Sequence, residues 1–323
     1  MSFTIDVHHH ILPEVFYRAT NDASNPVGGI HPAAWSKEST LSFMDDAGID
    51  VAITSISTPG VHMGDDAAAC DLARRVNELS ADLIRERPER FGGYAALPLP
   101  DVDGSLRELE YSLDVLKMDG VVLFSNARGI YLGDPRFDPL FAELERRGTV
   151  VFVHPTASPD SAARANLQLP DSLIDFTADT TRAIAKLHYS NTFARTPNVK
   201  YIFSHAGGTM PFLATRLSII DRMNVMPGAE ERETADDTFR KLYWDTALSW
   251  RAPNLRMLRS VTGMGQVLFG SDYPYLRRDM AVSCRREVET SAELAGDESR
   301  AVLADNALKL FPRLRELRDR KSS

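Results

Sequence analysis

The sequence predicts a distorted (β/α)₈ barrel of the TIM type, formed by residues 1–323 as a single domain with extra C-terminal helices. Short apolar segments alternate with amphipathic segments along the chain, as strands and helices alternate in such barrels. Some strand segments are unbroken apolar runs, such as residues 150–153, and these are typical of parallel strands buried on both faces. The side chains with the strongest acid–base and metal-binding chemistry directly follow strand segments, where barrels carry their active sites.

Eight segments are predicted as strands: residues 4–10, 51–56, 91–97, 120–124, 149–153, 199–204, 242–246 and 267–270. Helices are predicted between and after them, at residues 39–47, 65–86, 105–118, 137–147, 173–193, 211–223, 254–261, 280–294 and 298–317. A doubly wound open sheet is the alternative. The sequence lacks the glycine-rich phosphate-binding signatures that often accompany that fold, so the barrel is favoured.

The composition is that of an ordinary globular protein. The chain has 323 residues, 43% of them hydrophobic and 25% charged, and a net charge of −8. An acidic chain without a basic stripe argues against nucleic acid as a partner. Cys70 and Cys284 have no metal-like spacing, so we expect free thiols and a cytoplasmic location. No apolar run approaches the length of a membrane span.

The stretch from Ile5 to Pro13 carries three consecutive histidines. Apolar and polar residues alternate in it, which predicts a strand. Since residues two apart in a strand point to the same face, His8 and His10 should converge about 6–7 Å apart, and His9 should face the scaffold. Two imidazoles on one face can bind one metal ion, provided that the rest of the chain supplies further ligands.

Further reactive side chains end three other strand segments. His154 follows residues 149–153, His205 follows residues 199–204, and Asp272 follows the strand at 267–270. Any one of them alone could be a structural residue. Because a barrel brings the carboxyl ends of its strands together, the set predicts a metal site with an acid–base group beside it.

Four motifs carry a resemblance to a known family. They are D-x-H-x-H at residues 6–10, H-P at 154–155, S-H-A-G-G at 204–208 and G-S-D-Y-P at 270–274. Together they resemble the decarboxylase branch of the amidohydrolase superfamily, which includes aminocarboxymuconate-semialdehyde, γ-resorcylate and 6-methylsalicylate decarboxylases. Residues 55–60, 97–100 and 131–134 look more like the 6-methylsalicylate members. The resemblance covers essentially the whole chain and implies a distorted barrel of the amidohydrolase type.

The resemblance also implies a ligand set. His8, His10, His154 and Asp272 would bind one divalent metal ion, for which we expect Zn²⁺, with Mn²⁺ as the alternative. The fourth strand segment ends without the lysine that bridges two metals in many hydrolases of the superfamily, so a mononuclear site is expected. His205 would be the acid–base residue, with Asp272 as its partner.

The expected activity is metal-dependent, non-oxidative decarboxylation of a salicylate-like aromatic acid, such as 6-methylsalicylate. The alternative is a metal-dependent hydrolase of lactones or amides, or a hydratase, in which His205 would activate water. Members of this branch are usually dimers or tetramers, so a homodimer or homotetramer is expected.

Four residues are candidates for substrate binding. Arg216 lies at the offset from His205 where the semialdehyde decarboxylase pattern has an arginine that reaches across a dimer contact, although it could equally be a solvated helix charge. Trp35, together with His31, lies in a long loop that could cover the pocket. Phe176 and Tyr275 could line that pocket. A second arginine of the semialdehyde pattern is absent from residues 41–45, which favours an aromatic acid.

Overall fold

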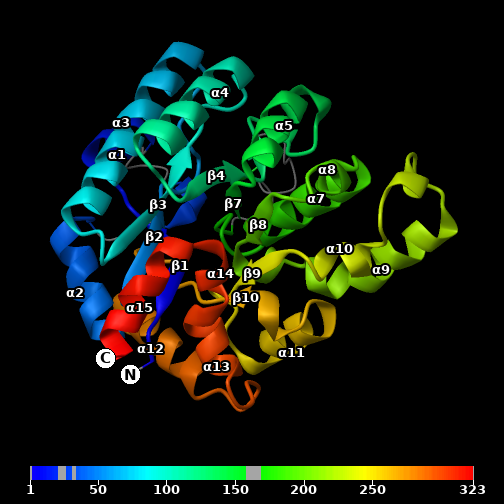
Figure 1. Ribbon diagram of the computed structural model, residues 1–323. Helices are drawn as coiled ribbons and strands as arrows, with labels where there is room; N and C mark the ends of the chain where they lie inside the picture. The colour runs from blue at the N-terminus through cyan, green and yellow to red at the C-terminus, as the bar shows by residue number, and fades with distance from the viewer. Residues whose placement is uncertain (1, 21–26, 31–33, 158–168, 323) are drawn as a thin grey trace.

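A computed structural model describes residues 2–20, 27–30, 34–157 and 169–322, and it shows a barrel of eight parallel strands surrounded by helices (Figure 1). Neighbouring strands pair in the order β1-β2-β3-β4-β7-β8-β9-β10. Their bounds are Ile5–His10 (β1), Val51–Ser55 (β2), Phe91–Ala96 (β3), Gly120–Phe124 (β4), Val150–His154 (β7), Lys200–Phe203 (β8), Tyr243–Asp245 (β9) and Val267–Leu268 (β10). The predicted fold class is therefore confirmed.

The barrel closes between β1 and the residues that follow β10. The Val7 N–H donates to the Phe269 carbonyl at 2.9 Å, and the His10 N–H donates to the Tyr273 carbonyl at 2.8 Å. In the opposite direction, the Asp272 N–H donates to the His8 carbonyl at 2.9 Å. This irregular closure replaces a regular ladder between β1 and β10, and it places the first and last motifs of the chain side by side.

Helices cover the outside of the barrel (Figure 1). The first half has α1 (Glu14–Thr20), α2 (Lys37–Ala47), α3 (Asp66–Glu86), α4 (Val102–Glu110) and α5 (Asp138–Arg147). The second half has α7 (Asp175–Tyr189), α8 (Thr192–Arg195), α9 (Met210–Met223), α10 (Ala235–Phe239), α11 (Ala252–Val261), α12 (Arg278–Glu289), α13 (Glu298–Arg300), α14 (Ala307–Leu310) and α15 (Arg315–Ser322). A short hairpin, β5 (Asn126–Ala127) and β6 (Ile130–Tyr131), follows β4.

Three predicted helices are broken in the structure. The helix predicted over residues 105–118 begins earlier, at Val102, and changes to a π-helix at Tyr111–Val115. The helix predicted over residues 173–193 ends at Tyr189, because Asn191 adopts a left-handed conformation (φ 61°) before α8 begins. The helix predicted over 298–317 is interrupted by a π-turn at Ala301–Asp305 and again at Pro312, which has no N–H to continue it. Helix α1 and the β5–β6 hairpin were not predicted. These differences leave the strand ends, and hence the site, unchanged.

No helix among the described residues is both long and apolar enough to cross a membrane. The two cysteines are both free: Cys284 is buried and Cys70 is partly exposed. The predicted loop around His31 lies largely outside the described residues, as does His31 itself.

Candidate metal centre and its pocket

Strand β1 brings two imidazoles to one face, as its alternation predicts. The ring centroids of His8 and His10 lie 4.9 Å apart, and their Nε2 atoms lie 3.0 Å apart. His9 points to the other face, where its Nδ1 lies 3.0 Å from an Asp6 carboxylate oxygen and its ring contacts Tyr273. The three consecutive histidines are thus divided between the site and the scaffold.

His154 joins this pair from the end of β7. Its ring centroid lies 5.2 Å from that of His8 and 4.8 Å from that of His10. Its Nδ1 lies 2.8 Å from the Pro155 carbonyl, which can only accept, so Nδ1 carries the proton. Burial and the neighbouring imidazoles hold the pKa of His154 well below its usual value. The ring is therefore neutral and its Nε2 keeps a lone pair for a cation.

Asp272 connects the histidines through its two oxygens. Its Oδ1 lies 3.3 Å from Nε2 of both His8 and His10, whereas Oδ2 lies 3.4 Å from Nε2 of His205. Asp272 and His205 both have left-handed backbone conformations, with φ of 58° and 54°. Such conformations cost energy for residues other than glycine and are concentrated at functional sites. The turns after β8 and β10 are shaped to aim these two side chains.

The cluster fits a divalent metal ion. The ligand atoms of His8, His154, His205 and Asp272 all lie within 4.8 Å of one another, and His10 is next to them. All five residues are buried. Two imidazole nitrogens at 3.0 Å repel each other unless a proton or a cation lies between them, and one cation satisfies several such nitrogens together. Among the described residues this is the one group of metal-binding side chains with such spacing.

The charges of the cluster agree with that chemistry. Burial opposes ionisation of Asp272, but His8 and the other imidazoles around it outweigh burial and hold its pKa well below the usual range. For His10, a base, burial has the opposite effect and lowers the pKa. Burial alone would lower the pKa of His8, but the Asp245 and Asp272 carboxylates raise it to about 10. A carboxylate and neutral imidazoles are the protonation states that bind metal, and a proton on His8 is the one that a cation would displace.

A cavity of about 380 Å³ opens directly onto the cluster. Its described walls contain His154, His205 and Asp272, and no lysine or arginine. The remaining lining residues are apolar or carry hydroxyl groups, apart from one glycine: Gly28, Ile30, Ser57, Thr58, Ser172, Leu173, Phe176, Thr177, Leu248, Ser249, Tyr275 and Leu276. A carboxylate that enters this cavity therefore meets no lysine or arginine from the described part of the chain.

The structure brings two of the four predicted substrate residues to this cavity. The Phe176 ring lies 6.5 Å from that of His154, and the Tyr275 ring lies 5.4 Å from that of His10. Trp35 is partly buried against one of the two core clusters and does not line the cavity. Arg216 is exposed on α9 and does not line it either. Within one chain, neither Trp35 nor Arg216 reaches the site, so their roles stay predictions.

Two buried aspartates support the site, and neither is among the residues predicted from the sequence as catalytic, substrate-binding or metal-binding. Asp6 accepts hydrogen bonds from the Ser271 N–H at 3.0 Å and the Ser271 hydroxyl at 2.6 Å. Asp245 lies 2.7 Å from Nδ1 of His8. Asp245 is the last residue of β9 and lies one residue before the end of the strand predicted at residues 242–246, so the rule that singled out Asp272 could have found it too.

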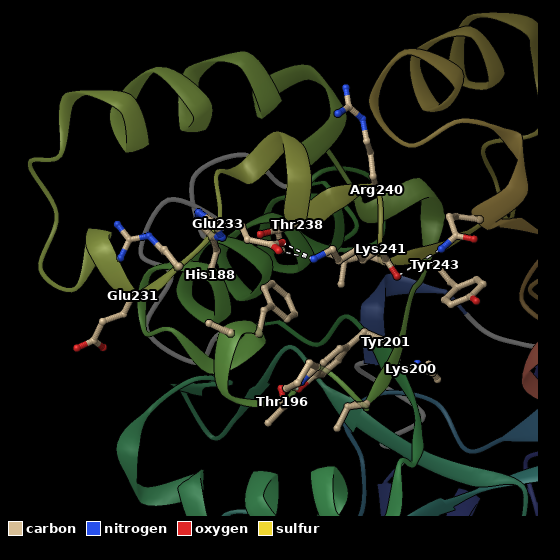
Figure 2. Close-up of a pocket in the computed structure, with 17 residues that line it drawn as sticks. His188, Thr196, Lys200, Tyr201, Glu231, Glu233, Thr238, Arg240, Lys241 and Tyr243 are labelled. Carbon is tan, nitrogen blue, oxygen red and sulfur yellow. Dashed lines mark hydrogen bonds and ion pairs between the residues drawn. The ribbon is translucent and has the colours of Figure 1, made fainter.

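A larger cavity, of about 600 Å³, lies at the other end of the strands (Figure 2). Lys200, Tyr201 and Tyr243, at the starts of β8 and β9, line it. None of the five clustered residues does so. Several of its charged groups are already paired, as Figure 2 shows for Lys241 and Glu233, whose Nζ and Oε1 lie 2.5 Å apart. Size alone therefore does not identify the functional cavity.

Comparisons with known proteins agree with this geometry. The chain is 37% identical to decarboxylase macB of Penicillium terrestre, over 96% of this chain and 95% of that protein. It is 36% identical to 6-methylsalicylic acid decarboxylase acuB of Aspergillus aculeatus, over 96% of each. The solved structure of 5-carboxyvanillate decarboxylase LigW from Sphingomonas paucimobilis matches with a TM-score of 0.83 at 25% identity, over 97% of this chain and 99% of that one. A family model described as amidohydrolase matches residues 5–313, and this chain belongs to the decarboxylase branch of that family.

Proposed function

We propose that this protein is a metal-dependent carboxy-lyase that removes carbon dioxide from a salicylate-like acid, with 6-methylsalicylate as the leading candidate. The observation that carries the proposal is the junction of a metal-binding cluster with a cavity whose described walls are largely apolar and contain no basic side chain other than its histidines. The similarity to 6-methylsalicylic acid decarboxylase supports the same substrate class.

His8, His10, His154 and Asp272 are the proposed ligands. His10 is preferred to His205 because its Nε2 faces the same Asp272 oxygen as His8 does, whereas His205 faces the other oxygen. Three imidazoles and one carboxylate suit Zn²⁺, with Mn²⁺ as the alternative that metal analysis would detect. A bound cation would supply the positive charge that holds the carboxylate and the neighbouring phenolic oxygen of the acid.

His205 and Asp272 are the proposed proton carriers. The Nε2 of His205 and Oδ2 of Asp272 lie 3.4 Å apart at the wall of the cavity. A proton passes from this pair to the ring carbon that bears the carboxylate. The bond from that carbon to the carboxylate then breaks, carbon dioxide leaves, and the electron pair restores the aromatic ring. The step balances: the aromatic carboxylate and one proton give the arene and carbon dioxide.

The walls of the cavity hold the ring. Phe176 and Leu276 offer apolar surface, which suits a methyl substituent better than a second hydroxyl group. The Tyr275 hydroxyl is a neutral donor, because burial raises its pKa to about 12. Orientation of the acid by such walls accounts for a large share of the rate in a reaction of this type.

The test is to incubate the metal-loaded protein with 6-methylsalicylate, γ-resorcylate and a simple lactone. Release of carbon dioxide and loss of the acid's absorbance are expected with 6-methylsalicylate. Hydrolysis of the lactone, together with no turnover of either aromatic acid, would instead favour a hydrolase and overturn the proposal.

We also propose that the protein is a homo-oligomer that buries the outer face of α9. Phe212, Ile219 and Met223 on this helix are 76%, 52% and 60% exposed, and Arg216 lies among them. A second copy would cover this apolar stripe and carry Arg216 toward a neighbouring site. Sedimentation of Phe212→Asp should show smaller particles than the wild type, and an unchanged sedimentation coefficient would contradict the proposed face.

A further inference from the structure

The buried Asp245 side chain holds two parts of the site at once. It ends β9 and pairs in register with Leu268 of β10. Its Oδ2 lies 2.7 Å from Nδ1 of His8. Its Oδ1 accepts hydrogen bonds from the backbone N–H groups of His205 at 2.8 Å and Ala247 at 3.0 Å. The side chain is fully buried, so water cannot replace these partners.

We propose that Asp245 is a positioning residue that fixes the metal-facing tautomer of His8 and the backbone of His205 together. The catalytic half of this inference rests on the proposed decarboxylation, whereas the metal-binding half does not. Asp245 is not among the residues that line the cavity, so it acts through the groups that it holds.

The first role concerns the His8 ring. A carboxylate oxygen accepts, so Nδ1 of His8 donates to it and the opposite nitrogen, Nε2, is the one left to bind a metal ion. That Nε2 is the atom that faces His10 and Asp272. Carboxylates that orient a ligating histidine in this way contribute strongly to metal affinity.

The second role concerns the turns after β8 and β9. His205 and Ala206 both have left-handed backbones, with φ of 54° and 55°, and Leu248 does also, with φ of 53°. A left-handed backbone is unfavourable for residues other than glycine, so surrounding contacts must hold each of these residues in place. The Asp245 Oδ1 binds the N–H groups at the starts of both turns. The Asp245 Oδ1 atom therefore orients both the His205 imidazole and the part of the cavity wall that contains Leu248.

Gly270 gives separate support for close packing at this point. A Cβ atom on Gly270 would lie 2.8 Å from Cβ of His8 and 3.3 Å from Cβ of Asp245. Contacts this short require the neighbours to move. The absence of a side chain at residue 270 is thus what allows the two strands to bring His8 and Asp245 together.

Asp245→Asn tests the proposal, because an amide cannot accept at both ends. If its NH₂ group faces His8, the imidazole must move its proton to Nε2 and lose the metal-facing lone pair. If the NH₂ group faces the turns, it meets two backbone donors. We expect metal affinity, measured by titration without substrate, to fall by roughly 10- to 100-fold. A visible spectrum of the Co²⁺-loaded variant should change as well.

Asp119→Asn is the matched control. Asp119 is a partly buried residue whose carboxylate also accepts a backbone N–H, from Gly93 at 3.0 Å, and it pairs with Arg313 at 2.6 Å, away from the metal cluster. This variant should lose stability while keeping wild-type metal affinity. Equal metal affinity in Asp245→Asn and the wild type would overturn the proposal.

Turnover at saturating metal separates the two roles. If Asp245 also positions His205, kcat of Asp245→Asn stays reduced after the metal site is filled. Full recovery would remove the second role and leave the first. If the wild type decarboxylates no aromatic acid, the proposed function fails, and the metal titration still decides the first role.

A measurement on the wild type covers the case in which the variant does not fold. Zinc-loaded protein with ¹⁵N-labelled histidine can be studied by proton–nitrogen NMR. The His8 ring should show a proton on Nδ1, shifted far downfield by the Asp245 carboxylate, and an Nε2 atom that binds the metal. The His154 proton, which is bonded to a neutral carbonyl, gives the internal reference. If His154 is the only metal-bound histidine with a proton on Nδ1, and His8 gives no such signal, the proposal is overturned.

Discussion

The two ends of the barrel carry two cavities with opposite chemistry. At the amino ends of β8 and β9 the larger cavity is lined by charged groups of both signs, among them the ion pair of Lys241 with Glu233 (Figure 2). At the carboxyl ends the smaller cavity meets Asp272 and several imidazoles, with no lysine or arginine on its described walls. The difference teaches that a converging set of metal-binding side chains, and not volume, marks the functional end.

Backbone strain is distributed in the same way. Four of the eight non-glycine residues with positive φ among the described residues lie in the loops that follow β8, β9 and β10. They are His205, Ala206, Leu248 and Asp272. Such strain persists only where surrounding bonds maintain it, and here those bonds come from Asp245 and the barrel closure.

Removal of the metal should have the largest effect. Dialysis against a chelator should abolish turnover, because the carboxylate of the acid then meets no positive charge beyond the histidines. It should also lower the melting temperature: a ligand at 1,000 times its Kd stabilises the fold by about 4 kcal/mol. Re-addition of Zn²⁺ should restore both. Full turnover in protein shown to be free of metal would contradict the conclusion that the metal-binding cluster marks the functional end of the barrel.

Asp272→Asn should come next. The amide still offers one oxygen but carries no negative charge and cannot relay a proton to or from His205. Loss of general acid–base chemistry alone lowers rates by about 10²–10⁴-fold, and weaker metal binding adds to that. The measurements are kcat at saturating metal and the metal content of the purified variant, each compared with the wild type. A variant with wild-type values of both would remove Asp272 from the site.

Tyr275→Phe should have a moderate effect. The neutral phenol donor at the cavity wall would be lost while the ring packing against His10 remains. A hydrogen bond of this kind is worth about 1 kcal/mol or somewhat more, so kcat/KM should fall by up to about tenfold. Metal affinity should not change, which distinguishes this variant from changes in the cluster. A large loss of metal would show that Tyr275 acts on the ligands instead.

Lys241→Met should have the smallest effect. It removes a charge at the larger cavity, from an ion pair in which Lys241 is 66% exposed and Glu233 is 52% exposed. Exposed pairs contribute less than about 1 kcal/mol, so thermal unfolding should shift only slightly. Metal content and kcat should match the wild type. A marked loss of turnover would assign a function to the amino-terminal end.

The strand pattern and the clustered residues could be predicted from sequence because both follow from short-range rules. Alternation in β1 separated His8 and His10 from His9, and the strand-end rule brought in residues from distant β7, β8 and β10. Asp245 lay within reach of the same rule, but its importance comes from two backbone N–H groups, which no side-chain pattern reveals. Arg216 and Trp35 were harder, since their predicted roles depend on a second chain or on a loop that is only partly described.

The irregular closure between β1 and the residues after β10 gives the site a topological role. His8 and Asp272 lie on opposite sides of this seam, and a backbone hydrogen bond from the Asp272 N–H to the His8 carbonyl crosses it. A metal ion bound by both side chains would act as a reversible cross-link between β1 and the residues that follow β10, the first and last strands of the barrel. Hydrogen exchange at the amides of Val7, His10 and Asp272 should therefore report metal occupancy directly, without any substrate.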